Sequence, residues 1–354
     1  MLPERFLERL RQIVPPERLP GVLAAFEAAG RVAFRVNPLR GSRDQVLEEL
    51  HTSGLSPAPV AWYADAFTVP YDQRGPLLAS DAVARGAAYV QNLASMVPPL
   101  ALDPQPGERV LDLAAAPGSK TLQMAALMQN EGEIAAVEVV RDRFFRLRAN
   151  AEAAGATVVR TFLQDGTRVD RYRPDHFDRV LLDAPCSTEG RFRADDLETT
   201  RYWSERKVRE MQSKQERLLA AGVRSLREGG VLVYSTCSLA PEENEVVLDR
   251  LLTTFEGALA LEPIPVAVPE LAPPLTAWQG KPFAHDLGYA RRLLPDGTFE
   301  AFFVARLRKT GPTAQPENSR TREHRPLRDA PAPRRNRRTY LDDHEPSGRP
   351  RRPR

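Results

Sequence analysis

The feature that most constrains this chain is a regular alternation of apolar runs with amphipathic segments from about residue 91 onward. Alternation at this spacing implies right-handed βαβ crossovers and a mainly parallel sheet with helices on both faces. The sequence therefore predicts an α/β domain. Strands are expected at 109–113, 134–139, 157–163, 179–182 and 231–234, and helices at 121–129, 142–154, 204–226 and 241–252.

Different patterns flank this alternation. Ahead of it we expect a small α+β domain, with helical periodicity at 4–29, a strand at 32–36, a helix at 43–51 and extended pieces at 60–62 and 67–69. Behind it, two apolar runs flank Pro295-Asp296-Gly297-Thr298, which is a hairpin signal and predicts an antiparallel pair at the end of the sheet. The expected parts are residues 1–75, 76–309 and 310–354.

The last part, 310–354, is a basic Pro- and Arg-rich tail. From Gly311 onward it carries twelve Arg against six Asp and Glu, whereas the whole chain has a net charge of +3. With few apolar residues it cannot bury enough surface to fold alone, so we predict disorder. Two interpretations stay open, an electrostatic arm for nucleic acid and a solubilising segment.

Composition also bounds the compartment. No apolar run approaches the ~18 residues that span a bilayer, and the start at Met1 does not read as a signal peptide, so a cytoplasmic protein is expected. The 354 residues hold two cysteines, too few for a disulfide framework. No paired Cys/His spacing suggests zinc, so we expect free thiols and no metal.

Polar or reactive residues follow each predicted strand, where open α/β sheets bind their ligands. The first loop reads Ala114-Ala115-Ala116-Pro117-Gly118-Ser119-Lys120-Thr121, and its small residues allow backbone to approach a ligand at a helix N-terminus. It is not a phosphate-binding Walker loop, because Ser119 precedes Lys120 and the leading Gly is absent. After the later strands come Glu138, then Asp165, then Asp183 with Cys186, and finally Cys237.

This set of residues favours one of three chemistries. Hydride transfer would require a Gly-x-Gly-x-x-Gly turn and phosphoryl transfer a Walker loop, and neither is present. Methyl transfer from S-adenosylmethionine fits better. One acid would bind the ribose, another the adenine amine, and the small-residue loop would surround the methionine moiety.

Two thiols at strand ends indicate the methyl acceptor. Cytosine C5 attacks a methyl group only after a thiolate adds to C6, and a base must then remove the C5 proton. Cys186 and Cys237 suit these two tasks, although the residues alone do not rank them, and inert core packing is the alternative. Asp183 is expected to hold the cytosine edge and Lys120 to stabilise negative charge. The target base must leave its stack to reach the pocket.

Three segments together resemble the RsmB/Sun-type (RsmB/RsmF-like) S-adenosylmethionine-dependent RNA (cytosine-5) methyltransferases. They are the loop 114–121, Asp183-Ala184-Pro185-Cys186-Ser187, and Ser235-Thr236-Cys237-Ser238 with Pro241-Glu242-Glu243-Asn244-Glu245. The similarity covers roughly residues 32–309. It implies a Rossmann-like class I methyltransferase domain preceded by a small α+β RNA-binding domain.

The resemblance also implies roles for single residues. Cys237 would be the nucleophile and Cys186 would assist product release, while residues 114–120, Glu138, Asp165, Asp183 and Arg143 would bind the cofactor. Arg35 and Asn37 would contact the RNA backbone, with a surface charge and a turn former as the alternative. We expect a monomer acting on ribosomal RNA. A transfer-RNA methyltransferase and a non-catalytic RNA-binding or ribosome-assembly factor stay as alternatives.

Overall fold

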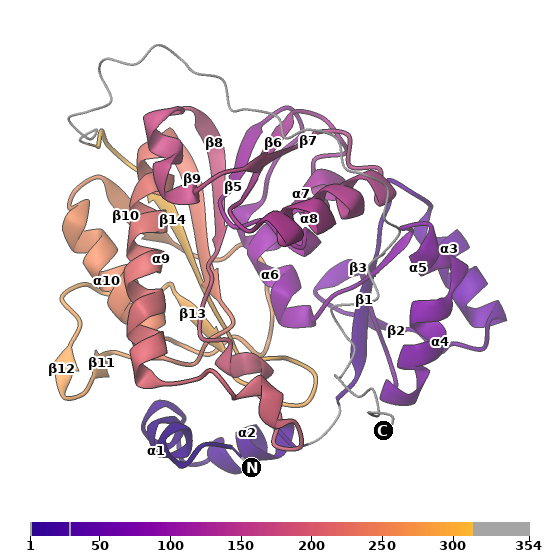
Figure 1. Cartoon of the computed structure of the whole chain (residues 1–354), viewed down its shortest axis with the longest axis horizontal. Coiled ribbons are helices and arrows are strands. Elements are labelled where there is room, and N and C mark those ends of the chain that lie inside the picture. The colour runs from indigo at the N-terminus through magenta and orange to yellow at the C-terminus, as the bar shows by residue number, and fades with distance from the viewer. Residues whose placement is uncertain (1, 28–29, 314–354) are drawn as a thin grey trace, which may run out of the picture.

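The computed structural model describes residues 2–27 and 30–313. Figure 1 shows a large central sheet with helices on both sides and a smaller sheet beside it that carries α3, α4 and α5. The helices are α1 (Glu4–Ile13), α2 (Leu19–Ala25), α3 (Arg43–Thr52), α4 (Arg74–Ala79), α5 (Asp81–Ala84), α6 (Leu93–Leu102), α7 (Ser119–Leu127), α8 (Arg141–Ala153), α9 (Glu205–Ser225) and α10 (Glu245–Thr254).

The strands fall into a small sheet, a large sheet and one separate hairpin. The small sheet has β1 (Val32–Val36), β2 (Ala58–Val60), β3 (Tyr63–Val69) and β4 (Ala88–Val90). The large sheet has β5 (Arg109–Asp112), β6 (Glu133–Glu138), β7 (Val159–Leu163), β8 (Phe177–Asp183), β9 (Leu226–Thr236), β10 (Leu259–Glu262), β13 (Arg291–Leu293) and β14 (Phe302–Lys309). The hairpin is β11 (Ala277–Trp278) with β12 (Lys281–Pro282).

The large sheet confirms the predicted architecture. Its order is β10-β14-β9-β8-β5-β6-β7, and the five strands from β9 to β7 pair in parallel. β14 runs antiparallel to β9, β13 and β10, so the predicted antiparallel terminal hairpin is also confirmed. The edge strand β10 was not predicted, because it opens the irregular, Pro-rich segment after residue 256.

The strands are apolar on both faces because helices cover both faces. In β5, Val110 joins the cluster formed with α6 and α7, whereas Leu111 joins the cluster formed with α9 and α10. Both side chains are fully buried, and their alternation follows from the two-residue period of a strand. The apolar stripe of α9 begins after a capping residue, since the Ser204 hydroxyl accepts from the Lys207 amide at 3.1 Å.

The small sheet has the order β2-β3-β1-β4 and is antiparallel throughout. Its strand β4 lies after residue 75, and α1 packs against Phe192 and Leu294 of the large domain. The domain boundaries at residues 75 and 309 therefore stay a prediction. The tail predicted at 310–354 lies, from residue 314 on, outside the described residues.

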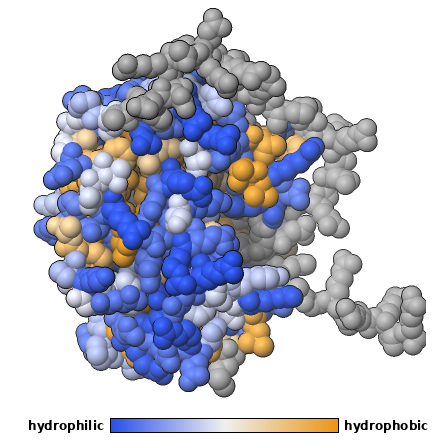
Figure 2. All heavy atoms as spheres, turned by 60° about the vertical axis from the view of Figure 1, so that its left-hand side comes forward, coloured by the Kyte–Doolittle hydropathy of each residue, from blue (hydrophilic) through white to orange (hydrophobic). Residues whose placement is uncertain are grey.

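Several element boundaries were predicted wrongly, two of them late in the chain; β3, for example, covers Tyr63–Val69 where 67–69 was expected. The helix expected at 241–252 begins only at Glu245, because Asn244 has φ −116° and ψ −97°, after the 3₁₀ turn η5 (Pro241–Glu243). The strand expected at 231–234 extends over Leu226–Thr236. In the part of the chain that the structure covers, no helix is both long and apolar enough to span a bilayer. The face bearing α10, turned forward in Figure 2, is mostly hydrophilic with small separate apolar areas.

Candidate active site

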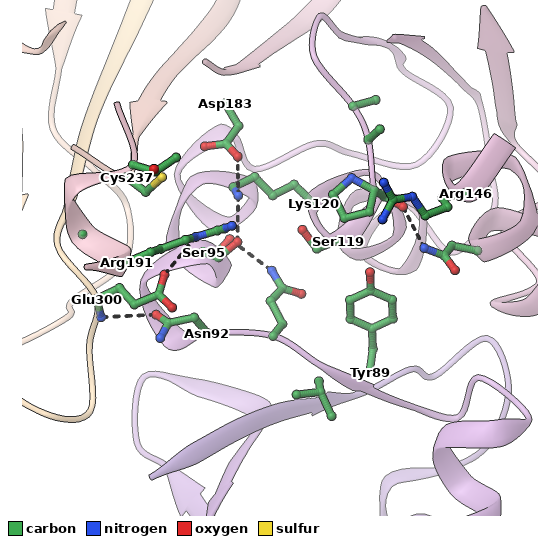
Figure 3. A pocket seen from close by; sticks show the side chains of 18 of the residues that line it. Tyr89, Asn92, Ser95, Ser119, Lys120, Arg146, Asp183, Arg191, Cys237 and Glu300 are labelled. Carbon is green, nitrogen blue, oxygen red and sulfur yellow. Dashed lines mark hydrogen bonds and ion pairs between the residues drawn. The ribbon is translucent and has the colours of Figure 1, made fainter. Parts of the chain in front are cut away.

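A cavity of about 1660 Å³ lies beyond the carboxyl ends of the parallel strands and reaches the small sheet. Every residue predicted to act in catalysis or to bind the cofactor, except Gly118, lines it. The lining includes Ala114, Ala115, Ala116, Pro117, Ser119, Lys120, Glu138, Arg143, Asp165, Asp183, Cys186 and Cys237. Figure 3 shows the side chains of Lys120, Asp183 and Cys237 converging from three elements on one part of this cavity.

The loop after β5 forms a backbone cradle. Gly118 stands at φ +114°, which favours glycine, and a Cβ there would lie 3.1 Å from Leu147 Cδ1. Asp112 is buried behind the loop, and its Oδ2 accepts from the Thr121 hydroxyl at 2.7 Å. Its Oδ1 has no hydrogen-bond partner among the described residues, and burial raises the pKa of Asp112 to about 7.

Glu138 and Asp165 mark one end of the cavity. The buried Glu138 carboxylate accepts from the Val140 amide at 2.8 Å and lies 3.5 Å from the Arg143 guanidinium. Arg143 also donates to the Ala116 carbonyl, so it links Glu138 to the loop after β5. Asp165 caps the 3₁₀ helix η2 (Gly166–Arg171), and its side chain keeps 49% of its surface exposed.

A buried ion pair occupies the centre of the cavity. Lys120 Nζ lies 2.6 Å from Asp183 Oδ2 and donates to the Ser95 hydroxyl at 2.7 Å. The other Asp183 oxygen accepts from the Ser235 hydroxyl at 2.9 Å. Lys120 is 5% exposed and is held by these two contacts, whereas the Asp183 side chain is 30% exposed.

The two cysteines meet at the carboxyl ends of β8 and β9. Their sulfur atoms lie 3.2 Å apart, and both thiols are free. The hydrogen bond from Cys186 lowers the pKa of Cys237, and the charge of Arg191 lowers it further, against the opposing effect of burial. The same contact, with burial, raises the pKa of Cys186. The environment therefore favours ionisation of Cys237 over ionisation of Cys186.

A buried polar network braces the two cysteine loops from behind. Glu243 accepts from the amide and hydroxyl of Ser187, at 2.9 and 2.5 Å, and from Gln215 at 3.2 Å. The Ser187 hydroxyl lies 3.1 Å from that of Ser238, which in turn donates to Glu189 at 3.2 Å. Each cysteine is thus followed by a serine of this network.

We expect Glu243 to make stability depend on pH. Burial, with the nearby charge of Glu189, raises the pKa of Glu243 to about 7 from an ordinary 4.5. Between these values the folded chain binds more protons than the unfolded chain, so stability falls as pH rises from about 5 to about 7. Two to three pKa units correspond to about 3 kcal/mol. Asp112 adds a fall of the same sign.

Denaturant unfolding across this pH range measures the effect. In Glu243→Gln the free energy of unfolding should decrease less between about pH 5 and about pH 7 than in wild type, and the decrease that remains is due to Asp112. Glu210→Gln removes an exposed carboxylate on α9 that pairs with Lys207, and so controls for net charge. An identical pH dependence in wild type and Glu243→Gln would contradict the assignment.

Arg35 and Asn37 do not lie where RNA phosphates can reach them, so that prediction is wrong. Arg35 is 1% exposed, donates to Gln91 at 3.0 Å and stacks its guanidinium on Tyr89 with 5.2 Å to the ring centroid. Asn37 is 2% exposed and donates to the carbonyls of Gly86 and Ala154, both at 2.9 Å. Both residues bind the small sheet to the large domain.

Sequence reasoning missed three residues at the centre of the site. Ser95 comes from α6 and contacts Lys120, Arg191 comes from the 3₁₀ helix η3 (Glu189–Arg191), and Glu300 comes from the loop before β14. Arg191 Nε lies 3.5 Å from Glu300 Oε2. No sequence spacing links Ser95, Arg191 and Glu300 to one another. The one signal in the sequence is that Arg191 lies five residues after Cys186.

Two known families of domain match the chain. Residues 99–308 match the family described as 16S rRNA methyltransferase RsmB/F, and residues 2–72 match the ferredoxin-like domain of RsmF/B-like methyltransferases. Among solved structures, a methyltransferase homolog protein from Pyrococcus horikoshii has a TM-score of 0.74 at 34% identity. That match covers 87% of this chain and 95% of the other.

Two curated relatives carry different substrates in their names. The tRNA (cytosine(49)-C(5))-methyltransferase of Pyrococcus abyssi is 39% identical over 79% of this chain and 88% of its own length. The ribosomal RNA small subunit methyltransferase F of Vibrio campbellii is 36% identical over 87% of this chain. The chain spans 63% of that second relative's length.

Proposed function

This chain belongs to the RsmB/F family of methyltransferases, and we propose that it methylates C5 of a cytosine in RNA with S-adenosylmethionine as the methyl donor. One observation carries the proposal: two thiols 3.2 Å apart share a cavity with the Lys120–Asp183 ion pair and the loop after β5. The target cytosine needs a nucleophile, a base and a charged clamp, and this group of residues supplies all three.

The residues at the other end of the cavity fit the cofactor. The small-residue loop 114–119 offers backbone close to a ligand, and Asp112, whose buried Oδ1 has no hydrogen-bond partner among the described residues, also lines the cavity. Glu138 and Asp165 supply carboxylates of the kind that bind ribose hydroxyls and an adenine amine. When bound, S-adenosylmethionine supplies an electrophilic methyl group. Arg143 holds Glu138 and the Ala116 carbonyl in place for that binding.

The first step assigned to the chain is the attack of Cys237. Its thiolate forms a bond to cytosine C6, and the C5=C6 electron pair moves to C5 and the ring. Lys120 and Asp183, 2.6 Å apart, clamp the polar edge of the base. The base has to leave its stack for C6 to reach the sulfur.

Release of the product falls to Cys186. In the free protein, the hydrogen bond to Cys237 is the main effect that raises the pKa of Cys186, and burial raises it further. Once the Cys237 sulfur is bonded to C6, that hydrogen bond and the charge on Cys237 are gone, so the pKa of Cys186 falls. Cys186 then loses its own proton to solvent in the open cavity, its thiolate takes the C5 proton, and the C5–H electron pair re-forms the C5=C6 bond as the Cys237 thiolate leaves C6.

We assign ribosomal RNA as the substrate, since the matching family is described as acting on 16S rRNA. Transfer RNA is the second candidate, supported by the 39% identity to the archaeal tRNA enzyme and by the 88% of its length that aligns. The match to the rRNA relative covers a smaller share of that protein's own length, 63%. The chemistry at the cysteine pair is the same for both substrates.

Bisulfite sequencing of RNA from cells with and without the protein tests this function. We expect at least one protected cytosine in small-subunit rRNA that becomes convertible in cells lacking the protein, and that the purified chain restores with S-adenosylmethionine. A site lost from tRNA instead would favour the second candidate. If all sites persist in both RNAs and the purified chain methylates neither, the chain is an RNA-binding factor without this activity.

A further inference from the structure

We propose that Arg191 is the cationic partner of Cys237, holding its sulfur as a thiolate and following the negative charge onto the cytosine ring. The first half of this role, stabilising the Cys237 thiolate, concerns the free protein and is testable without RNA. The second half, stabilising negative charge on the cytosine ring, rests on the proposed function. Arg191 lies outside the three segments that carry the family resemblance.

The backbone fixes Arg191 next to the nucleophile. The amide of Gly190 donates to the carbonyl of Cys237 at 2.9 Å, so η3 is tied to the end of β9 at the position of the thiol. Gly190 also packs against the loop before β14, where an added Cβ would lie 2.5 Å from the Ala301 carbonyl oxygen. This close approach sets Arg191 beside Glu300, its partner from that loop.

The side chain of Arg191 faces the cavity. It keeps 61% of its surface exposed and lines the cavity together with Cys186, Cys237 and Glu300. In Figure 3 its guanidinium points into the space that Lys120 and Asp183 enter from the other elements. Its ion pair with Glu300 is long, at 3.5 Å between Nε and Oε2, and partly exposed. Such a pair is weak, so the guanidinium is available to a stronger anion.

Arg191 faces two anionic groups, Cys237 and Glu300, and its ion pair with Glu300 is long and partly exposed. Cys237 has the largest effect in raising the pKa of Arg191, followed by Glu300, with Asp183 and Cys186 contributing less. Asp183 is already paired with Lys120 at 2.6 Å. Reciprocally, Arg191 lowers the pKa of Cys237, whereas Asp183 and Glu300 raise it. Arg191 is therefore the positive charge that acts on the nucleophile, while Lys120 acts on Asp183.

The same guanidinium suits the next stage of the reaction. When the sulfur gives its electron pair to C6, the C5=C6 pair moves into the ring and the negative charge passes from sulfur to the base. The net charge of the site does not change in this step. A cation that already lies beside the sulfur therefore needs only a change of rotamer to stay close to the negative charge. Arg191 has the exposure to make that movement, and its planar donors suit the oxygen of the ring.

Alkylation of the thiols by iodoacetamide at a series of pH values tests the first half of the role. Peptide mapping by mass spectrometry reports Cys237 and Cys186 separately in the full chain. We expect Arg191→Gln to move the midpoint of Cys237 alkylation up by about one pH unit, so that its rate near neutral pH falls about tenfold. Arg191→Lys should recover most of the rate. An unchanged midpoint in Arg191→Gln would overturn the proposal.

Two further variants make the test specific. Glu300→Gln removes a charge that raises the pKa of Cys237, so the midpoint should move down, opposite to Arg191→Gln. Arg201→Gln removes the same charge as Arg191→Gln, from an arginine that pairs with Glu198 before α9, and should leave the midpoint where it is. Equal shifts in Arg191→Gln and Arg201→Gln would mean a general charge effect and would also overturn the proposal.

Single-turnover methylation then separates this inference from the proposed function. If wild type methylates RNA, Arg191→Gln should lower the rate of the chemical step about a hundredfold and leave binding of S-adenosylmethionine unchanged. A normal rate in that variant would refute the second half of the role while the proposed function stands. If wild type itself fails to methylate, the proposed function fails, and the alkylation result still decides the thiolate half.

Discussion

Cys237→Ala should abolish methylation, and Cys186→Ala should leave the chain covalently attached to RNA. The first variant lacks the sulfur that bonds to C6, so C5 never becomes nucleophilic and turnover falls at least about a thousandfold. The second keeps that sulfur and its neighbour Arg191 but lacks the base for the C5 proton. Methyl transfer then proceeds once, and elimination of the Cys237 thiolate stops.

Denaturing gels of each variant with radiolabelled RNA and S-adenosylmethionine measure both outcomes. We expect a slow-migrating adduct with Cys186→Ala, none with Cys237→Ala, and none with the double variant. Cys186→Ser is the matched control for packing, because a hydroxyl fills the site better than Ala does and stays protonated near neutral pH, so it should trap the adduct as well. A stable adduct from Cys237→Ala and none from Cys186→Ala would reverse the two roles.

The environment of the two cysteines agrees with Cys237 as the nucleophile and Cys186 as the base. The two sulfur atoms lie 3.2 Å apart, the hydrogen bond between them lowers the pKa of Cys237, and the Gly190 amide ties η3, with Arg191, to the Cys237 carbonyl. Loss of Cys186 also removes that hydrogen bond, so we expect adduct formation in Cys186→Ala to be slower than in wild type. Raising the pH should restore the rate, because the thiolate of Cys237 then forms without the donor.

Much of the fold follows from local patterns. The apolar runs at Val110 and Val231 predict buried parallel strands because each side chain meets a helix whichever face it points to. The hairpin at Asp296 and Gly297 follows from turn chemistry, and the five strand-end positions follow from the rule that such sheets bind ligands at their carboxyl ends. These features depend on neighbours within about ten residues, which a sequence displays directly.

The remaining features depend on contacts between distant segments. Ser95 reaches Lys120 only because α6 packs beside α7, and Glu300 reaches Arg191 only because Gly190 allows the loop before β14 to approach η3. Arg35 reads as a surface cation in sequence, yet β1 pairs with β4 and turns it onto Gln91 and Tyr89. The electrostatic setting of each cysteine is likewise a product of tertiary packing.

Asp183→Asn should lower the methylation rate about 10²- to 10³-fold and also destabilise the chain. The variant keeps the shape of the side chain but leaves Lys120, which is 5% exposed, with the Ser95 hydroxyl as its remaining close partner. Breaking a buried pair by removing one member costs about 3–5 kcal/mol, and the 30% exposure of Asp183 reduces this to the lower end.

The double variant Lys120→Met/Asp183→Asn separates stability from catalysis. It removes both charges and replaces the lysine with an apolar chain of similar length, packed beside Phe302, so most of the lost stability should return. Activity should not return, because the charged clamp on the cytosine edge is gone. Denaturant unfolding and single-turnover methylation on the same preparations give both quantities. Recovery of activity along with stability would mean that the pair serves the fold alone, and that the clamp must be sought in Arg191.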